Sequence, residues 1–459
     1  MAAGKGTRMK SRVPKVLHRL AGRPLLQHVM DTVGSLQARR VSVITGNAAD
    51  EVEAAVAGWP RAERTPAPAF VRQEPQLGTG HAVQQAVPQL RDDGCVLILN
   101  GDVPLIGAAT LQRLCESSGG ERLALLSIEM PDPAGYGRIV REGDAVRAIV
   151  EHKDATEEQR GLREVYTGFM AVPGGLLKRW LSRLTNDNTQ GEYYLTDIVA
   201  LAVQDGTEVV AVRAPEQVEV DGVNSPLQLA DLERAWQLRH ARALMEAGVR
   251  LADPARFDLR GELVCGQDVE IDVNCVFKGR VTLGDDVRIG ANCVIANATV
   301  ASGAVIHPFT YIDGEKAGVQ IGEGAFVGPF ARLRPGAQLG PDVHIGNFVE
   351  VKNSTLARGA KANHLAYLGD ATVGERVTYG AGSITANYDG ANKHRTVIED
   401  DVHIGSNCVL VAPVTIGKGG TVGGGSTVTK DAAPGVLSVA RGKQVAITGW
   451  KRPVKGEKK

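Results

Sequence analysis

The repeat that decides the fold reads Val281-Thr-Leu-Gly284-Asp-Asp and then Val287-Arg-Ile-Gly290-Ala-Asn. An aliphatic or small residue opens each six-residue unit, a second aliphatic follows two positions later, and glycine often comes next. A period of six with turn-forming residues matches neither an amphipathic helix nor an alternating strand. It is typical of a parallel β-helix of hexapeptides, roughly three per coil, in which each coil buries its inward residues by stacking on its neighbours.

The repeat extends from about Leu263 to Val436 and changes phase along the way. The predicted inward positions are Val269, Cys275, Val281, Val287, Cys293 and Val305, with Ile271, Leu283, Ile289 and Ile295 two residues on, then Ala325, Ala331, Ala337, Val343 and Val349, and finally Val402, Ile404, Val414 and Ile416. A single match to this pattern is common, whereas a dozen in phase are not, so we predict a β-helix here.

Composition predicts two domains and excludes several functional classes. The 459 residues include 55 glycines but only 4% aromatics, as turn-dense, narrow coils require. A formal net charge of +0 gives no reason to expect nucleic acid or an anionic membrane as partner. The six cysteines form no C-x-x-C pair, and Cys275 and Cys293 fall at inward positions. With no long apolar run and no signal peptide, we predict a soluble cytoplasmic protein.

The chain opens on a glycine-rich loop, Gly4-Lys5-Gly6-Thr7-Arg8-Met9, with Pro14-Lys15 after it. Such a loop lets backbone N–H groups approach phosphates, and Arg8 and Lys15 add positive charge. A tight surface turn is the alternative for a lone G-x-G. The whole string, however, resembles the signature of sugar-nucleotide pyrophosphorylases.

A phosphate-binding loop of this kind is expected to follow a buried strand that supplies its rigid base. This chain begins at the loop. Either the start codon was assigned too late, or the domain has lost a central strand. Because a lost central strand would leave its neighbours' backbone groups unpaired, we expect a misassigned start.

Two apolar, β-rich runs at residues 41–46 and 95–100 flank a helix-like segment, which predicts a doubly wound α/β sheet. Asp102 follows the second run, so it is expected in the ligand crevice, where one carboxylate and phosphate oxygens can hold Mg²⁺. The alternative is a turn or N-cap aspartate. Gln73 and the loop 77–80 suit recognition of a base edge.

Polar clusters stand out in the β-helix, because ordinary coils need little beyond inward aliphatics. The cations Arg334, Lys352 and Lys393 can together neutralise a sugar phosphate. Histidine suits a general base, and although a single histidine is more often structural, the cationic and tyrosine residues around His364 favour catalysis. Residues 386–393 break the repeat and are predicted to project as a loop. An alternative function for the histidines of the β-helix is zinc binding by three of them. The candidate ligands, however, lie in different coils: His307, His344, His364 and His403.

Between the two halves, Ser225-Pro226 is predicted to open a helix that Gly248 ends. Leu229, Leu232, Trp236 and Leu244 recur at helical spacing. We interpret them as a packing face on a linker helix.

Over nearly its whole length, the chain resembles the bacterial family of bifunctional N-acetylglucosamine-1-phosphate uridylyltransferase/glucosamine-1-phosphate N-acetyltransferases. The resemblance also rests on residues 135–138, 150–154, 191–197 and 221–224. It implies a Rossmann-like α/β nucleotidyltransferase domain with a mixed, mostly parallel sheet over 1–224, lacking its first strand. A helical linker over 225–249 and a left-handed parallel β-helix acetyltransferase domain with a C-terminal tail over 250–459 would follow.

The resemblance also implies binding residues in the first domain. Those for UTP and the UDP-sugar are Gly4, Lys5, Arg8, Lys15, Gln73, Gly78, Thr79, Gly137, Glu151, Tyr166 and Asn224, and those for Mg²⁺ are Asp102 and Asn224. Two positions depart from the family pattern. Tyr166 stands where an asparagine is frequent, which puts one sugar contact in doubt, and Asn100 stands where a tyrosine or small polar residue is usual.

In the second domain, the resemblance implies His364 as the base, which we expect Glu350 to orient. The residues implied for glucosamine-1-phosphate are Arg334, Lys352, Tyr367, Thr378 and Lys393, and those for acetyl-CoA are Ala381, Asn387, Tyr388, Ser406, Gly424 and Arg441. Thr378 replaces an asparagine of some members. The family further implies homotrimers, with acetyl-transfer sites between protomers to which the 386–393 loop and Arg441 contribute.

Two other functions remain open from the sequence. One is an acetyltransferase alone, its first domain impaired by the missing strand. The other is a non-catalytic regulatory relative, against which the presence of Lys15, Asp102 and Asn224 argues.

Overall fold

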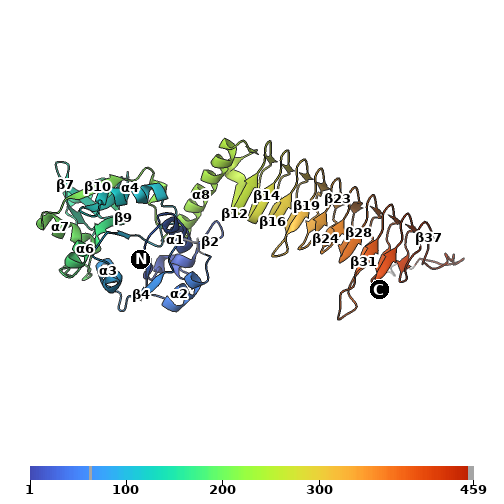
Figure 1. Ribbon diagram of the computed structural model, residues 1–459, viewed down its shortest axis with the longest axis horizontal. Helices are drawn as coiled ribbons and strands as arrows, with labels where there is room; N and C mark the ends of the chain where they lie inside the picture. The colour runs from blue at the N-terminus through green and yellow to red at the C-terminus, as the bar shows by residue number, and fades with distance from the viewer. Residues whose placement is uncertain (61–64, 453–459) are drawn as a thin grey trace, which may run out of the picture. The chain divides into compact units, whose positions relative to one another are not determined.

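The computed structural model describes residues 1–60 and 65–452, which form two compact units, Met1–Trp236 and Gln237–Lys459. Figure 1 shows helices around a sheet in the first unit and a stack of coils in the second. The first unit alternates strands with helices, whereas the second repeats short strands from coil to coil. The two are therefore described separately.

The first unit has a six-stranded mixed sheet in the order β10-β6-β9-β7-β8, in which β5 also pairs with β9. Its strands are β5 Cys95–Ile98, β6 Leu123–Glu129, β7 Arg138–Glu142, β8 Ala145–Val150, β9 Glu164–Pro173 and β10 Val209–Arg213. The predicted mixed sheet is confirmed, and residues 135–154 do contain a hairpin, β7–β8. The pairing is less parallel than expected, because β9 runs antiparallel beside both β5 and β6.

The described part of this unit also contains two smaller ladders and the α-helices α1 to α7. β1 Arg19–Leu20 pairs with β2 Arg23–Pro24, and β3 Ser42–Thr45 pairs in parallel with β4 Ala69–Arg72. The helices are α1 Leu25–Ser35, α2 Ala49–Ala57, α3 Thr79–Gln85, α4 Ala108–Ser118, α5 Glu157–Arg160, α6 Gly174–Leu181 and α7 Ile198–Gln204. β6 is buried on both sides over six of its seven residues, as expected of a strand that helices cover on both faces.

α8 (Pro226–Glu246) begins and ends as the sequence predicts. The Ser225 hydroxyl accepts from the Gln228 N–H at 3.3 Å. Gly248 has φ +99° and donates its N–H to the Met245 carbonyl at 3.0 Å. Leu229, Leu232 and Trp236 pack into a core cluster of the first unit. No described helix is long and apolar enough to cross a membrane.

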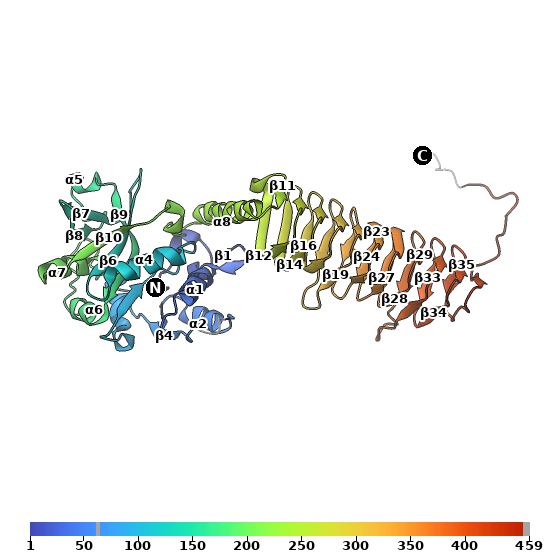
Figure 2. The ribbon, with the colours of Figure 1, turned by 45° about the horizontal axis from the view of Figure 1, so that its top comes forward.

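The second unit is a parallel β-helix, and its coils are seen edge-on in Figure 2. An eleven-stranded sheet contains β11 Arg250–Leu251, β13 Glu270–Ile271, β15 Arg288–Ile289, β17 Val305–Ile306, β20 Phe326–Val327, β23 His344–Asn347, β26 Lys361–His364, β29 Thr378–Tyr379, β32 His403–Ile404, β35 Thr421–Val422 and β37 Leu437–Ser438. All its ladders are parallel.

The remaining strands of the coils form a sixteen-stranded sheet. They are β12 Phe257–Cys265, β14 Cys275–Leu283, β16 Val294–Val300, β18 Tyr311–Asp313, β19 Val319–Ile321, β21 Arg332–Leu333, β22 Gln338–Leu339, β24 Glu350–Lys352, β25 Thr355–Leu356, β27 Tyr367–Gly369, β28 Ala371–Val373, β30 Ile384–Ala386, β31 Thr396–Ile398, β33 Val409–Val411, β34 Val414–Ile416 and β36 Thr427–Val428. Stacked partners such as Glu270 and Arg288 are three hexads apart in sequence, which confirms the predicted coil length.

The predicted inward positions are buried, with one exception. Val305 is only half-buried, and its neighbours Ala304 and Ile306 face the core instead. The cause is a shortened coil. Arg288 stacks on Val305 rather than on residue 306, and the ladder shifts register after Lys278. Counting in sixes across that deletion gave the wrong phase.

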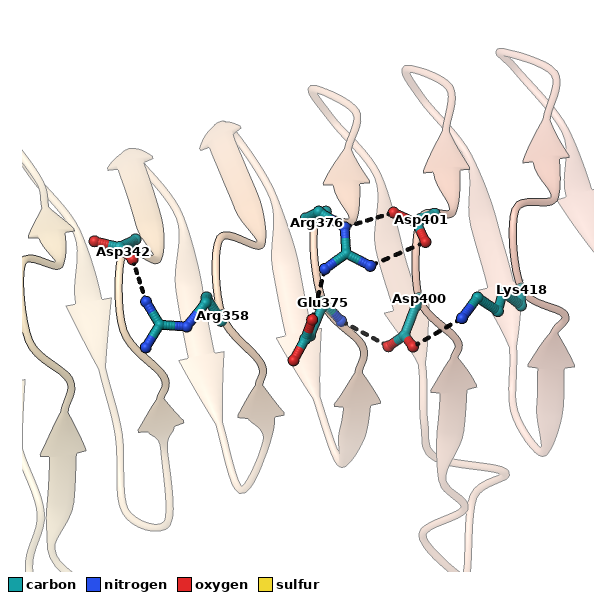
Figure 3. Close-up of polar contacts among 7 residues, drawn as sticks. All are labelled: Asp342, Arg358, Glu375, Arg376, Asp400, Asp401 and Lys418. Atoms are coloured by element: carbon teal, nitrogen blue, oxygen red, sulfur yellow. Dashed lines mark hydrogen bonds and ion pairs between the residues drawn. The ribbon is translucent and has the colours of Figure 1, made fainter.

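One corner of the coils carries a ladder of charges (Figure 3). Arg358 bonds Asp342 at 2.6 Å. The next pair begins two coils beyond Asp342. There Arg376 donates to both carboxylate oxygens of Asp401, at 2.7 and 3.0 Å. Exposed pairs like these contribute little individually, about 0–1 kcal/mol. Because each joins successive coils, we interpret the ladder as fixing coil register.

Candidate active sites

The first candidate site centres on a cation held between two oxygen-bearing side chains. Lys15 Nζ donates to the Asp102 carboxylate and, at 3.1 Å, to Asn224 Oδ1. Asp102 follows β5, and the Val223 N–H donates to its carbonyl at 2.9 Å, which holds Asn224 at the end of that strand. All three polar side chains are at most partly exposed. The structure thus brings together three residues that lie far apart in the sequence.

This oxygen pair fits a magnesium ion. Carboxylate and amide oxygens are hard donors of the kind Mg²⁺ takes, and it usually completes its shell with water and substrate phosphates. In the structure the Lys15 ammonium stands where such a cation would be stabilised. Among the described residues there is no group of three or more His, Cys, Asp or Glu side chains that could hold a metal. A resident, all-protein metal cage is therefore not what the residues suggest.

The glycine-rich loop is exposed and closely packed at one point. Gly4, Lys5 and Arg8 are exposed to solvent. Gly6 has φ +60°, and a Cβ there would lie 2.7 Å from the Lys15 Cβ. Only glycine permits this approach without strain, so Gly6 lets the loop pass directly over Lys15.

The second polar loop is held against residues 193–195. Gln73 is buried and donates from Nε2 to the Gly78 carbonyl at 2.9 Å. Gly78 has φ +109°, and a Cβ on it would lie 2.6 Å from the Tyr193 carbonyl oxygen. The Leu195 N–H donates to the Thr79 hydroxyl at 3.0 Å. The loop is therefore rigid, as recognition of a base edge requires.

A cluster of carboxyl groups lies around Glu151, at the end of the β7–β8 hairpin. Burial raises the pKa of Glu151, which accepts from the Thr196 hydroxyl at 3.0 Å. Burial also raises the pKa of Asp197 to about 6. Neither Thr196 nor Asp197 was predicted to have a role, although both lie in the 191–197 stretch. No local signal separates a buried aspartate from a solvated one.

Tyr166 and Gly137 adjoin this cluster. The Tyr166 N–H donates to the Gly137 carbonyl at 2.9 Å, and a Cβ on Gly137 would lie 3.7 Å from Glu151 Oε1. The Tyr166 side chain is buried, and its hydroxyl has no hydrogen-bond partner among the described residues. Burial raises the pKa of this phenol, so it is a neutral donor with a free hydrogen bond to give. Asn100 lies nearby, against Gly168.

The second candidate site is cationic. Arg334 and Lys352 lie on successive coils, and Glu350 accepts from Arg334 at 2.7 Å. The pKa of Lys352 is lowered, chiefly by its contact with Lys393 and further by burial and Arg334. Like charges held together in this way attract an anion. The structure therefore brings together the three cations that the sequence analysis grouped.

The imidazole of His364 is oriented by Asn347, not by Glu350 as expected. The two residues are register partners, and His364 Nδ1 lies 2.8 Å from Asn347 Oδ1. Since a carbonyl oxygen only accepts, Nδ1 carries a proton, and in the neutral ring Nε2 is then the nitrogen with the lone pair. Glu350 is instead engaged by Arg334 and Arg332. The expectation failed because Glu350 lies in β24 of the sixteen-stranded sheet, where its register partner is Tyr367, whereas Asn347 lies opposite His364 in the eleven-stranded sheet.

The remaining predicted residues follow the same corner along the axis. The Gly382 N–H donates to the His364 carbonyl at 3.3 Å, and the Asn407 N–H to the Ala381 carbonyl at 2.8 Å. The Gly425 N–H then donates to the Ser406 carbonyl. His364, Ala381, Ser406 and Gly424 thus form one column, each on the next coil. Arg441 Nη1 caps it by donating to the Gly424 carbonyl at 2.5 Å.

Tyr367, Thr378 and the loop residues lie beside this column. Tyr367 is the register partner of Glu350. The Tyr367 hydroxyl lies so close to Gly369 that a Cβ on Gly369 would clash with it. Thr378 is exposed on β29. The predicted loop projects between β30 and β31 (Figure 1), and Tyr388 is 62% exposed there. Asn387 is buried, and its Nδ2 donates to Asp370 at 2.5 Å, so its side chain serves the base of the loop.

The other histidines of the coils are dispersed. His307 and His344 lie on either side of the Phe326 ring, with centroids 6.2 and 5.0 Å from it. His403 is in β32, away from both. Their positions give the zinc alternative no support.

Two family profiles match this chain, one in each unit. The sequence profile of the MobA-like NTP transferase domain matches residues 1–167, and that of the bacterial transferase hexapeptide (six repeats) matches 263–297, 318–353 and 395–430. A solved UDP-glucose pyrophosphorylase complexed with UDP-glucose matches at 18% identity and a TM-score of 0.41, covering 51% of this chain and 96% of that one.

Curated relatives match over their full length. The "Bifunctional protein GlmU" of a Polaromonas species is 71% identical, covering 100% of this chain and 98% of that protein. The protein of the same name from Paracidovorax citrulli is 72% identical, covering 99% and 98%. That of Herminiimonas arsenicoxydans is 55% identical, covering 100% and 99%.

Proposed function

This chain belongs to the family of bifunctional GlmU proteins, and from that membership we propose which residues carry its two reactions. It acetylates glucosamine-1-phosphate with acetyl-CoA, and it transfers uridylyl from UTP to N-acetylglucosamine-1-phosphate with release of pyrophosphate. We assign uridylyl transfer to residues 1–224 and acetyl transfer to 250–459, with 225–249 as the linker. The alternative of an acetyltransferase alone is not favoured.

For uridylyl transfer we propose that Gly4, Lys5, Arg8 and Lys15 bind the triphosphate, and that Gln73, Gly78 and Thr79 bind uridine. The observation that supports this most is the Lys15 ammonium set against Asp102 and Asn224. Mg²⁺, when held by Asp102 and Asn224, would neutralise charge on the phosphates. Lys15 is then free to turn to the same phosphates and, with Arg8, to stabilise the leaving pyrophosphate.

For the acetylated sugar we propose binding by Gly137, Glu151 and Tyr166. Glu151 accepts from a sugar hydroxyl, and the unpartnered Tyr166 hydroxyl donates to the sugar in place of the asparagine amide frequent in the family. A buried donor left without a partner costs free energy, so a bound acceptor there is favoured. The sugar phosphate is thereby aligned for attack on the α-phosphorus of UTP.

For acetyl transfer we propose that His364 Nε2 takes a proton from the glucosamine ammonium and that the free amine attacks the thioester carbonyl. Arg334, Lys352, Tyr367, Thr378 and Lys393 hold the sugar phosphate. Ala381, Asn387, Tyr388, Ser406, Gly424 and Arg441 hold acetyl-CoA, and an amide N–H near Ala381 stabilises the oxyanion. The single column of His364, Ala381, Ser406 and Gly424 supports this assignment.

Two assays on the same purified chain test the assignments together. One follows CoA thiol release from acetyl-CoA and glucosamine-1-phosphate, and the other follows pyrophosphate release from UTP and N-acetylglucosamine-1-phosphate. Activity in both is expected. CoA release alone would contradict the proposed uridylyl site.

Replacing Lys393 with Gln should raise the KM for glucosamine-1-phosphate by about tenfold, which corresponds to one charge-assisted hydrogen bond. Lys393 touches Lys352, so removing its charge weakens the attraction of the cluster for a phosphate. Initial rates of CoA release over a range of sugar phosphate concentrations measure the change. Lys430→Gln, a change at an exposed lysine near the solenoid's end, is the control. An unchanged KM would remove Lys393 from the phosphate site.

We further propose that the chain is a homotrimer in the cytoplasm, with each acetyl-transfer site completed by a neighbour. Phe309, Phe330 and Phe348 stack at one corner with centroids 5.0 and 5.4 Å apart, and Leu365 continues the column. All four are about half exposed or more. An apolar column of this kind marks a protein interface. Phe348 directly follows Asn347 in sequence, and Leu365 directly follows His364. This supports an acetyl-transfer site at a subunit boundary. All six cysteines are free, as in a reducing compartment.

Replacing Phe330 with Glu should convert trimers to monomers and depress acetyl transfer, because three carboxylates would be buried in the interface. Uridylyl transfer should persist. Light scattering after size exclusion gives the mass, and the two assays give the activities. Phe326→Glu changes an equally exposed ring on a different face and is the control. A trimeric, fully active Phe330→Glu protein would place the interface elsewhere.

A further inference from the structure

The loop between β30 and β31 leaves the coils at Asn387 and returns at Thr396, and one residue of the preceding coil holds both of its ends. Asn387 Nδ2 donates to Asp370 Oδ2 at 2.5 Å, and the Thr396 N–H donates to the Asp370 carbonyl at 3.2 Å. Asp370 is only 7% exposed, and its neighbour Ala371 is the register partner of Thr396. The side chain and the main chain of Asp370 therefore fix where the loop begins and ends.

On its other side, Asp370 is joined to the coil that carries Lys352. The Asp370 N–H donates to the Lys352 carbonyl at 3.1 Å, and Asp370 Oδ1 accepts from Asn353 Nδ2. Asn353, Asp370 and Asn387 are each 17 residues apart, so they form a ladder of amide, carboxylate and amide across successive coils. Asp370 thus links the coil of Lys352 to the loop of Lys393.

This ladder requires a carboxylate at its centre. The side chains of Asn353 and Asn387 both direct an amide N–H at Asp370, and a carboxylate offers an acceptor oxygen to each of them. An amide in its place would present one oxygen and one NH₂ group, so one donor would face another donor without an acceptor. The charge of the carboxylate also makes both hydrogen bonds stronger than those to a neutral amide.

The same charge acts on the cationic cluster. Lys393, burial and Arg334 lower the pKa of Lys352, and the negative charge of Asp370 opposes that change. Because like charges repel, the contact between Lys352 and Lys393 persists only where the surrounding structure holds the loop in place. Asp370 supplies both the hydrogen bonds that hold the loop and an opposite charge beside the cluster.

We propose that Asp370 is a positioning residue for the sugar phosphate, because by holding the loop to the coil of Lys352 it sets the spacing of the Lys352 and Lys393 ammonium groups. This inference rests on the proposed acetyl-transfer site, in which both lysines bind glucosamine-1-phosphate. A phosphate that bridges two cations is bound most tightly when the cations are held at the matching distance. Asp370 is buried below the loop and acts through the lysines, so its loss should weaken binding of the sugar phosphate rather than proton removal at His364.

Replacing Asp370 with Asn should raise the KM for glucosamine-1-phosphate by about tenfold, the effect of weakening one charge-assisted hydrogen bond. The kcat for acetyl transfer should change by less than about threefold. Initial rates of CoA release by the full chain, over a range of sugar phosphate concentrations, measure both quantities. A variant that merely folds less well would instead show a lower kcat with an unchanged KM, because fewer molecules would be active.

A double variant tests the ladder itself. When Asp370→Asn is combined with Asn353→Asp, the amide at position 370 can accept from Asn387 and donate to the carboxylate at position 353. Both positions are left-handed, with φ of 50° and 44°, a conformation that aspartate and asparagine tolerate. The KM should therefore return to within about threefold of the parent value. Asp401→Asn is the matched control with an unchanged KM, because Asp401 is also left-handed (φ 60°) but pairs with Arg376 at another corner.

Hydrogen exchange of the substrate-free chain gives a readout that does not depend on acetyl transfer. The His394 N–H, which donates to the Asn387 carbonyl at 2.9 Å, should exchange about tenfold faster in Asp370→Asn and at the parent rate in the double variant. An unchanged exchange rate, faster exchange with an unchanged KM, or a double variant without recovery would overturn this inference alone. A parent chain that releases no CoA would overturn the proposed function and this inference with it.

Discussion

Replacing His364 with Ala should abolish acetyl transfer while leaving uridylyl transfer unchanged. The substrate amine is an ammonium at neutral pH and cannot attack a thioester until it loses a proton. His364 offers a free Nε2 because Nδ1 is bonded to Asn347 Oδ1 at 2.8 Å. Loss of a positioned general base typically costs 10²–10⁴-fold, so we expect a fall in kcat of about that size.

The two assays provide an internal comparison, since both reactions occur on one chain. CoA thiol release should fall by about 10²–10⁴-fold, whereas pyrophosphate release should match the parent. His344→Ala is the matched control, because that histidine lies on the same solenoid and packs on Phe326 rather than beside the cationic cluster. His364 is exposed, so its removal should not unfold the coil. Equal acetylation by the variant would exclude the assignment.

Much of the second unit could be predicted from sequence because its interactions are periodic. Each inward residue meets its equivalents one coil away, so a count of six identifies the core without knowledge of distant contacts. The count failed at Val305, where a coil is one residue shorter and nothing local marks the deletion. The six-residue period also did not predict the column of Phe309, Phe330 and Phe348, since exposed aromatic residues carry no periodic signal of their own.

The first unit was harder to predict because its contacts are long-range. Sequence placed Asp102 at a strand end, and the structure adds that Lys15 and Asn224 meet it there. The antiparallel insertion of β9 between β5 and β6 could not be foreseen, since β9 reads as a buried strand in either direction. The prediction that Glu350 orients the His364 ring was wrong for a related reason. Glu350 and Asn347 are only three residues apart but lie in strands of different sheets, and Asn347 is the one that lies opposite His364.

Replacing Asp102 with Asn should depress uridylyl transfer by about 10²–10³-fold and leave acetyl transfer intact, in line with the loss of one key electrostatic group. The substitution keeps the shape of the side chain but removes its negative charge. Lys15 then loses its ionic partner, and a divalent cation loses the only formally charged oxygen of the pair formed with Asn224. Both effects leave charge on the triphosphate less well neutralised.

Magnesium titrations separate this role from a purely structural one. If Asp102 holds the cation, the variant should need more Mg²⁺ for half-maximal rate, and excess Mg²⁺ should restore part of the loss. If Asp102 only holds Lys15 in place, the rate should fall without any change in the Mg²⁺ requirement. Asp92→Asn is the control, since that exposed carboxylate pairs with Lys178 at 2.8 Å near the other end of β5. An Asp102→Asn chain with an undiminished rate at limiting Mg²⁺ would rule out both roles, because neither the cation nor Lys15 would then depend on this charge.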